Sequence, residues 1–233
     1  MTVTPNSTAL IVGASRGLGL GLARELLNRG WRVIATLRSP DNKDLAALAG
    51  EFKDRLEIER IDITKPAEIA SLRQRLDGMP LDLLFVNAGI TNDRHQPIGA
   101  VPDADFTRVM ATNALGPMRV IEALQDLVRP DGTIAVMSSI LGSVGANESG
   151  GWEVYRASKA ALNTLMRSYA ARHRAGRRTL LAIAPGWVRT DMGGSTAPLD
   201  VATSMRGVVD TIEARRGTPG MFYVDYRNAI VPW

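Results

Sequence analysis

A tyrosine and a lysine four residues apart, Tyr155 and Lys159, are the pair in this sequence best suited to acid–base chemistry. If the residues around them form a helix, the two side chains lie on one face with their Cβ atoms about 5–6 Å apart. At an effective dielectric constant of about 20, an ammonium at that distance favours the phenolate by roughly 3 kcal/mol, or about two pKa units. A phenol with such a pKa can give or take a proton near neutral pH. The pair alone is weak evidence for such chemistry, because many helices carry a buried tyrosine beside a solvated lysine.

A glycine-rich turn near the N-terminus predicts a site for a dinucleotide. Residues 8–12 form an apolar run typical of a buried strand, residues 20–29 have apolar side chains at helical spacing, and Gly13, Gly17 and Gly19 stand between them. Glycines let a cofactor approach the backbone, and the N-terminus of the following helix offers unpaired N–H groups to a pyrophosphate. The Gly-Lys-Ser/Thr ending of a nucleoside-triphosphate loop is absent. A dinucleotide site is therefore favoured, with a plain strand-to-helix turn as the alternative.

The composition predicts one soluble α/β domain over residues 1–233, because 45% apolar residues allow a large core. The sequence has no cysteine and only two scattered histidines, His95 and His173, so we expect neither disulfides nor a metal site. Residues 1–7 are polar and no apolar run reaches membrane-spanning length, so we expect a cytoplasmic protein without a membrane partner. The net charge is +4, but arginines gathered in residues 167–178 fit the end of a helix, and we expect no nucleic-acid partner.

Strand-like and helix-like segments alternate along the chain, and this order predicts a parallel sheet with helices on both faces. The expected strands after the first cover residues 32–37, 56–60, 81–87, 133–138, 179–184 and 222–224. The expected helices after the first cover residues 44–52, 66–77, 103–128, 152–172 and 199–215. We expect Gly116 and Pro117 to kink the helix over residues 103–128, because proline removes a helical hydrogen bond.

Polar residues follow the expected strands at the edge where such sheets bind ligands. Arg38 ends the second strand where an NAD site would usually offer an acidic group, so we expect a cofactor with a 2′-phosphate. Asp62 ends the third strand and is a candidate acceptor for the adenine amino group, with a helix-preceding aspartate as the alternative. Further candidates at the ends of later strands are Asn87, Ala88, Gly89, Ser138, Ser139, Pro185, Gly186, Val188 and Thr190.

Together these motifs resemble those of the short-chain dehydrogenase/reductase family, in its order and at its spacings, over residues 8–233. Residues 155–163 and 185–194 are most similar to the carbonyl reductases of the sniffer and C-factor group. The resemblance implies a Rossmann-type doubly wound parallel sheet of about seven strands and the cofactor NADP(H). It implies hydride transfer to the carbonyl of small aldehydes, ketones or quinones, or the reverse oxidation of an alcohol. It also implies a homodimer or homotetramer through helices 103–128 and 152–172, where Ala157, Ala161 and Ser168 would permit close approach.

The resemblance assigns roles to the matched residues. Tyr155 would exchange a proton with the substrate oxygen, and Ser139 would hydrogen-bond the same oxygen. Lys159 would lower the pKa of the tyrosine and bind the nicotinamide ribose, while Asn113 would anchor a water that links Lys159 to solvent. Ser139 is preferred to Ser138 because alternation turns Ser138 to the opposite face, and ordinary polar roles stay open for Ser138 and Asn113. The implied cofactor-binding residues are Gly13, Ser15, Arg16, Gly17, Leu18, Gly19, Arg38, Asp62, Ile63, Asn87, Ala88, Gly89, Tyr155, Lys159, Pro185, Gly186, Val188 and Thr190.

Two segments bear on the substrate. Residues 140–154 are more numerous than is usual for the family and include Gly150 and Gly151, while residues 190–199 are too few for a long lid. We therefore expect a shallow, open pocket that discriminates weakly between related carbonyl compounds. The alternative function is an NADP-binding signalling or regulatory protein of the C-factor type with little turnover, which gives no reason for an intact serine, tyrosine, lysine and asparagine set.

Overall fold

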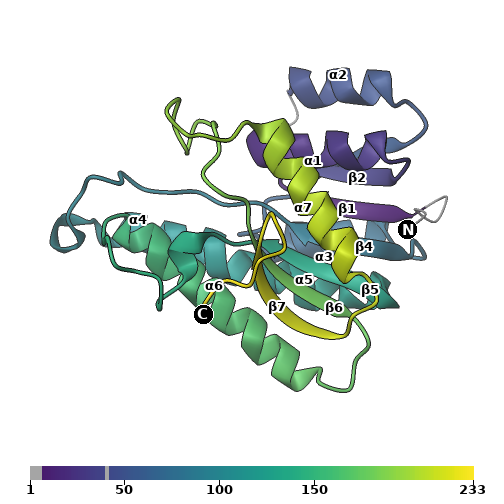
Figure 1. Ribbon diagram of the computed structural model, residues 1–233. Coiled ribbons are helices and arrows are strands. Elements are labelled where there is room, and N and C mark those ends of the chain that lie inside the picture. The colour runs from purple at the N-terminus through teal and green to yellow at the C-terminus, as the bar shows by residue number, and fades with distance from the viewer. Residues whose placement is uncertain (1–6, 40–41) are drawn as a thin grey trace.

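A seven-stranded parallel sheet forms the centre of the computed structural model, which describes residues 7–39 and 42–233 (Figure 1). The strands are β1 (Thr8–Val12), β2 (Arg32–Leu37), β3 (Leu56–Arg60), β4 (Leu81–Val86), β5 (Val128–Met137), β6 (Thr179–Ala184) and β7 (Gly220–Asp225). Their order is β3-β2-β1-β4-β5-β6-β7, and each neighbouring pair is parallel. Strands such as β6 are buried along their whole length, as expected when both faces of a sheet are covered. The predicted fold class is confirmed.

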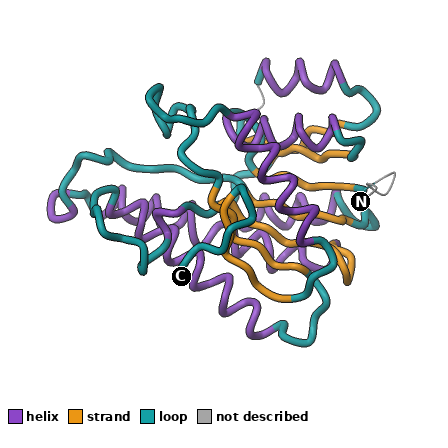
Figure 2. The backbone as a smooth tube through the Cα atoms, in the orientation of Figure 1, coloured by secondary structure: helices purple, strands orange, loops and turns teal. Residues whose placement is uncertain are grey.

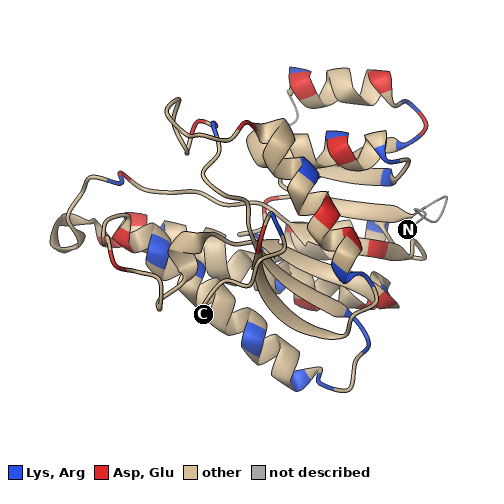
Figure 3. Cartoon of the chain, in the orientation of Figure 1, with Lys and Arg blue, Asp and Glu red and all other residues tan. Residues whose placement is uncertain are grey.

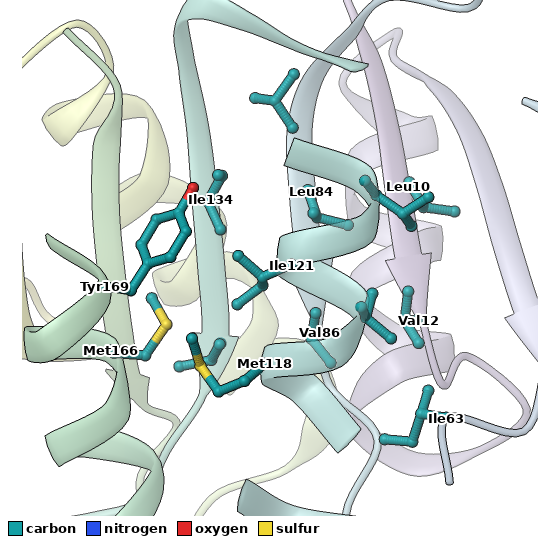
Figure 4. Close-up of a cluster of buried hydrophobic side chains, with 14 of the residues drawn as sticks. Leu10, Val12, Ile63, Leu84, Val86, Met118, Ile121, Ile134, Met166 and Tyr169 are labelled. Atoms are coloured by element: carbon teal, nitrogen blue, oxygen red, sulfur yellow. The ribbon is translucent and has the colours of Figure 1, made fainter. Parts of the chain in front are cut away.

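Helices cover both faces of this sheet and bury a separate apolar core on each. One core joins the strands to α1 (Gly17–Asn28), α2 (Lys43–Glu51) and α7 (Val201–Arg215). The other joins them to α3 (Pro66–Arg75), α5 (Gly116–Leu124) and α6 (Glu153–Arg172). In Figure 4, Leu10 and Val86 of the strands face Ile121 of α5, with Met166 and Tyr169 of α6 beside them. These cores fix α1 and α6 against the sheet at the two sides of the candidate site.

The helical stretch predicted over residues 103–128 extends from Asp103 to Leu127, but the chain changes its helical type within it. It consists of α4 (Asp103–Met110), a π-helical turn (Ala111–Leu115), α5 and a 3-10 turn (Gln125–Leu127), and β5 already begins at Val128. Pro117 lies just after the π-turn, and the helical backbone continues through Gly116, so its missing N–H removes a helical hydrogen bond at this point. The interruption therefore lies in the π-turn just before the proline, and such turns are frequent at functional sites.

Long connections gather at the carboxyl edge of the strands, as the teal segments of Figure 2 show. The order of the chain reverses between the adjacent strands β1 and β4, which places a crevice for ligands at this edge. Basic and acidic residues are interspersed along the chain (Figure 3), and the basic end of α6 includes Arg172, which pairs with Glu122 of α5. Within the described residues, no helix has both the length and the apolar content needed to cross a membrane.

Candidate active site

Tyr155 and Lys159 lie in the first turns of α6, on one face of that helix as their spacing predicts. Both side chains are nearly buried, with 9% of Tyr155 and 2% of Lys159 exposed. Lys159 Nζ lies 5.7 Å from the centroid of the Tyr155 ring and donates a 2.8 Å hydrogen bond to the carbonyl oxygen of Met137, the last residue of β5. The pair is therefore anchored to the carboxyl end of a central strand.

The predicted lowering of the Tyr155 pKa by Lys159 is wrong for this structure. Burial raises the pKa of Tyr155 to about 12, although a side-chain hydrogen bond with Ser139 acts in the opposite direction. Burial also lowers the pKa of Lys159 to about 8. Desolvation outweighs attraction here because both groups are enclosed and the ammonium is directed to the Met137 carbonyl. Near neutral pH the phenol is therefore protonated and the lysine still mostly charged.

The two serines after β5 point in different directions, as strand alternation predicts. Ser139 lies close enough to the Tyr155 phenol to oppose the rise in its pKa, and its hydroxyl accepts from the backbone N–H of Leu141 at 3.1 Å. Ser138 is 1% exposed and donates to Asn163 Oδ1 at 2.7 Å. Ser139 is thus the serine beside the phenol, while Ser138 joins the loop to α6.

Asn113 lies in the π-turn and is fully buried. Its Oδ1 accepts from the N–H of Ile90 at 2.8 Å, and its Nδ2 donates to the Ile90 carbonyl at 2.7 Å and to Ser158 Oγ at 2.9 Å. A Cβ atom on Gly89 would lie 3.4 Å from Asn113 Oδ1 and 3.5 Å from Lys159 Nζ, so these groups converge on the loop after β4. Asn113 therefore has a clear structural role, and one lone pair of its oxygen remains for the predicted water.

The glycine-rich turn after β1 allows a close approach that a Cβ atom would block. A Cβ atom on Gly19 would lie 2.0 Å from the Gly13 carbonyl oxygen, which accepts from Asn87 Nδ2 at 2.7 Å. Gly13 has φ +92°, and its N–H donates to the buried hydroxyl of Thr36 at 3.1 Å. The backbone N–H groups of Asn87 and Ala88 both donate to the Val12 carbonyl. The ends of β1, β2 and β4 are thereby joined around the turn.

The first turn of α1 is open to an anion. Arg16 is its N-cap residue without a capping side chain, and the turn contains no acidic residue. The Arg16 side chain is 71% exposed and pairs with Asp191 from the loop after β6. Ser15 accepts a 2.8 Å hydrogen bond from Asn42, and Leu18 packs against the core beneath α1.

The end of β3 carries the expected charges. Arg38 is exposed at the end of β2, close enough to favour the ionised form of Asp62. Burial alone would raise the pKa of Asp62, but hydrogen bonds from Thr64, with Lys65 and Arg38 nearby, lower it. Asp62 does not cap α3, whose N-cap is Lys65. The Ile63 side chain is 5% exposed in the core, so the backbone is the part of Ile63 available to a ligand.

The loop after β6 returns to the glycine turn. Gly186 has φ +84°, and a Cβ atom there would lie 2.6 Å from Leu199. The Pro185 carbonyl accepts from Ser204, and buried Val188 pairs with Leu199. A Cβ atom on Gly17 would lie 3.6 Å from Thr190 Cγ2. The structure therefore brings the predicted candidates from all these loops to one edge of the sheet.

Three residues that support this site were missed from the sequence. Tyr223 of β7 donates to the Ser139 carbonyl, and its ring contacts Trp233. Arg156 and Trp152 organise the loop before α6. The position of Arg156 between Tyr155 and Lys159 was the signal that the sequence offered for it, whereas Tyr223 lies far away in sequence and gave none.

Comparisons with known proteins agree with this geometry. The sequence profile of the family described as short chain dehydrogenase matches residues 7–199. A crystal structure of a short-chain dehydrogenase/reductase from Burkholderia multivorans with bound NADP is 53% identical, with TM-score 0.97, and the match covers 98% of this chain and 100% of that chain.

Two further relatives match the subgroup predicted from the sequence. The carbonyl reductase Sniffer of D. melanogaster is 33% identical with TM-score 0.89, over 99% of this chain and 100% of that chain. The C-signal protein of Myxococcus xanthus is 38% identical over 156 residues, which are 66% of this chain and 93% of that protein. The predicted resemblance to sniffer and C-factor proteins is confirmed.

Proposed function

The chain belongs to the short-chain dehydrogenase family, and from this premise we propose that it reduces the carbonyl group of small aldehydes, ketones or quinones. It is an NADP-dependent oxidoreductase, in agreement with the NADP-bound relative at 53% identity. The observation that carries the carbonyl proposal is the placement of the Tyr155 phenol beside Ser139 and Lys159 at the carboxyl edge of the sheet. The same residues would also perform the reverse oxidation of an alcohol.

NADPH, when bound, supplies the hydride for the carbonyl carbon. Tyr155 donates its proton to the carbonyl oxygen as negative charge develops there, and its raised pKa keeps that proton available at neutral pH. The Ser139 hydroxyl donates to the same oxygen and holds it near the phenol. Lys159 stabilises the resulting phenolate with its positive charge, and a water held by Asn113 would return the proton from solvent.

The residues at the carboxyl edge fit the cofactor. The glycine turn offers the space that a Cβ atom would fill, and the uncapped N-terminus of α1 suits a pyrophosphate. Arg16 and Arg38 would hold the 2′-phosphate, and Asp62 would accept from the adenine amino group. The loops after β4 and β6 would line the remainder of the cofactor site. Their residues there would be Asn87, Ala88, Gly89, Pro185, Gly186, Val188 and Thr190.

The proposal includes a broad substrate range. Ile140 is 47%, Val144 73% and Trp187 56% exposed on the loops at this edge, which supports an open site with few enclosing contacts. Affinity for any one small substrate should then be modest. A cytoplasmic location and a homodimer or homotetramer complete the proposal. Exposed apolar side chains on the helices expected at the subunit interface, Phe106, Leu115 and Leu165, support the oligomer.

The experiment follows NADPH absorbance on mixing the protein with a panel of aldehydes, ketones and quinones. We expect activated carbonyl compounds to react fastest, because their electrophilic carbons need the least help from binding. A preference of a thousandfold or more within a homologous ketone series would contradict the open site. Tight NADPH binding without turnover across the panel would favour the signalling alternative instead.

A further inference from the structure

Three consecutive residues before α6 have a left-handed backbone: Gly150 with φ +63°, Gly151 with φ +67° and Trp152 with φ +55°. Glycine adopts this conformation without steric cost, but a bulky residue such as tryptophan adopts it rarely and under strain. Strain of this kind persists where surrounding contacts fix the backbone, often at ligand sites. The left-handed backbone of Trp152 therefore indicates that neighbouring residues hold it in place.

Arg156 supplies the contacts that hold this turn. Its side chain is 9% exposed, and its Nε donates to the carbonyl oxygens of Gly150 at 3.2 Å and Gly151 at 2.8 Å. Its Nη2 donates to the Gly150 carbonyl and to Ser149 Oγ, both at 3.0 Å. The Arg156 backbone N–H donates to the Trp152 carbonyl at 2.8 Å. A planar guanidinium satisfies this set of acceptors in a way that a single ammonium cannot.

The turn places the Trp152 ring beside the proton donor. The centroids of the Trp152 and Tyr155 rings are 5.8 Å apart, with an interplanar angle of 64°, an edge-to-face contact. The Arg94 guanidinium, from the loop after β4, lies 5.4 Å from the centre of the Trp152 ring. The N–H of Ile98 from the same loop donates to Glu153 at 3.1 Å. The loops after β4 and β5 thus meet at Trp152, which stays partly exposed between them.

We propose that Trp152 is the specificity-determining wall of the substrate site, that it favours carbonyl compounds bearing an aryl group, and that Arg156 is the positioning residue that holds it there. This inference rests on the proposed carbonyl reduction. A flat aryl group next to a carbonyl bound at Tyr155 would contact the exposed part of the indole, and aromatic contacts contribute beyond the area they bury. An alkyl group of the same size would lack that contribution.

The test compares kcat/KM for a phenyl ketone and its cyclohexyl analogue in wild type, Trp152→Phe and Trp152→Ala. Phenylalanine and alanine carry a Cβ atom as tryptophan does, so the steric cost of the left-handed backbone is similar in all three proteins. We expect Trp152→Ala to reduce the phenyl-to-cyclohexyl ratio by roughly twofold to tenfold, the range of aromatic pair contributions, and Trp152→Phe to retain most of it. A ratio unchanged in Trp152→Ala would overturn the proposal for Trp152.

The positioning role of Arg156 is tested by the same ratio, which does not depend on how much of a sample is folded. We expect Arg156→Ala to lower the phenyl-to-cyclohexyl ratio to the value of Trp152→Ala, and the double variant to show no further loss. Arg167 is an exposed arginine on the same helix, and we expect Arg167→Ala to leave the ratio unchanged. If Arg156→Ala does not fold, Arg156→Lys takes its place, because it keeps the charge without the guanidinium fork. Near-ultraviolet circular dichroism should show a weakened Trp152–Tyr155 signal in either variant. Additive effects of the two substitutions would overturn the role of Arg156.

The proposed carbonyl reduction and the role of Trp152 can be refuted separately. Absence of turnover by wild type with both ketones and with the panel of aldehydes and quinones would remove the proposed function, and this inference with it. Turnover of both ketones with an unaltered ratio in the variants would leave the function in place and remove only the wall assigned to Trp152.

Discussion

Removing a single oxygen atom from Tyr155 tests the proposed chemistry most directly. Tyr155→Phe keeps the ring, its edge contact with Trp152 and its place near Lys159, and loses the hydroxyl beside Ser139. One hydrogen bond of such a hydroxyl is worth about 0.5–1.5 kcal/mol, and a domain stable by about 5–15 kcal/mol tolerates its loss. Loss of a general acid lowers turnover by about a hundredfold or more, equivalent to at least roughly 2.7 kcal/mol in activation free energy. We therefore expect a folded protein with a large loss of kcat.

The assay measures NADPH consumption with a quinone or an aromatic aldehyde, together with NADPH binding and the urea midpoint. Tyr169→Phe is the matched control, because Tyr169 lies on the same helix, is 1% exposed and donates one hydrogen bond, at 2.7 Å, to Gln125. We expect the control to lose comparable stability and to keep its turnover, and both variants to bind NADPH. If Tyr155→Phe retained more than about a tenth of wild-type kcat, or if Tyr169→Phe lost as much, the assignment of Tyr155 as proton donor would be refuted.

Three further predictions follow from charges and exposed surface. Arg38→Asp should replace attraction to the 2′-phosphate by repulsion and shift binding from NADPH towards NADH, and equal wild-type affinity for the two cofactors would show the charge argument to be wrong. Burial lowers the pKa of Lys159 from 10.5 to about 8. Between about pH 8 and pH 10.5 the unfolded chain therefore still holds this proton, whereas the folded protein has lost it. The free energy of unfolding of wild type, relative to that of Lys159→Met, should rise with pH over this range. Urea titrations that give a constant difference between the two proteins would contradict this sign. Leu165→Glu, at a residue 38% exposed on α6, should shift the oligomer towards smaller species in light scattering, and a wild-type monomer at micromolar concentration would count against the interface.

The sequence by itself determined the sheet. The predicted bounds of β1, β2, β3 and β6 agree with the structure. β1, β2 and β6 are mostly apolar and buried, and the edge strand β3 alternates apolar with charged residues. Motif order then placed Gly13, Ser139 and Tyr155 at one edge, since the carboxyl ends of parallel strands meet there. Spacing along α6 was enough to put Tyr155 and Lys159 on one face.

The break in the helix over residues 103–128 depended on tertiary structure. The sequence predicts one helix with a kink at Gly116 and Pro117, but it does not predict the π-turn that precedes them. The turn is accompanied by contacts from distant segments: Asn113 bonds Ile90 and Ser158, and Ile63 packs where a Cβ atom on Gly116 would be. Residues far apart in the chain make these contacts, and no local pattern encodes them.

The protonation of the site was likewise decided by the fold. The spacing of Tyr155 and Lys159 gives the attraction between them but not the water that burial removes from both, and desolvation reverses the expected direction of the tyrosine pKa. The strained backbone of Trp152 has the same origin, because it is held by Arg156 reaching back to the carbonyl oxygens of Gly150 and Gly151. The sequence determined which groups are present at the edge of the sheet, and only the packed structure decided their solvation and orientation, because both depend on neighbours that the chain brings together on folding.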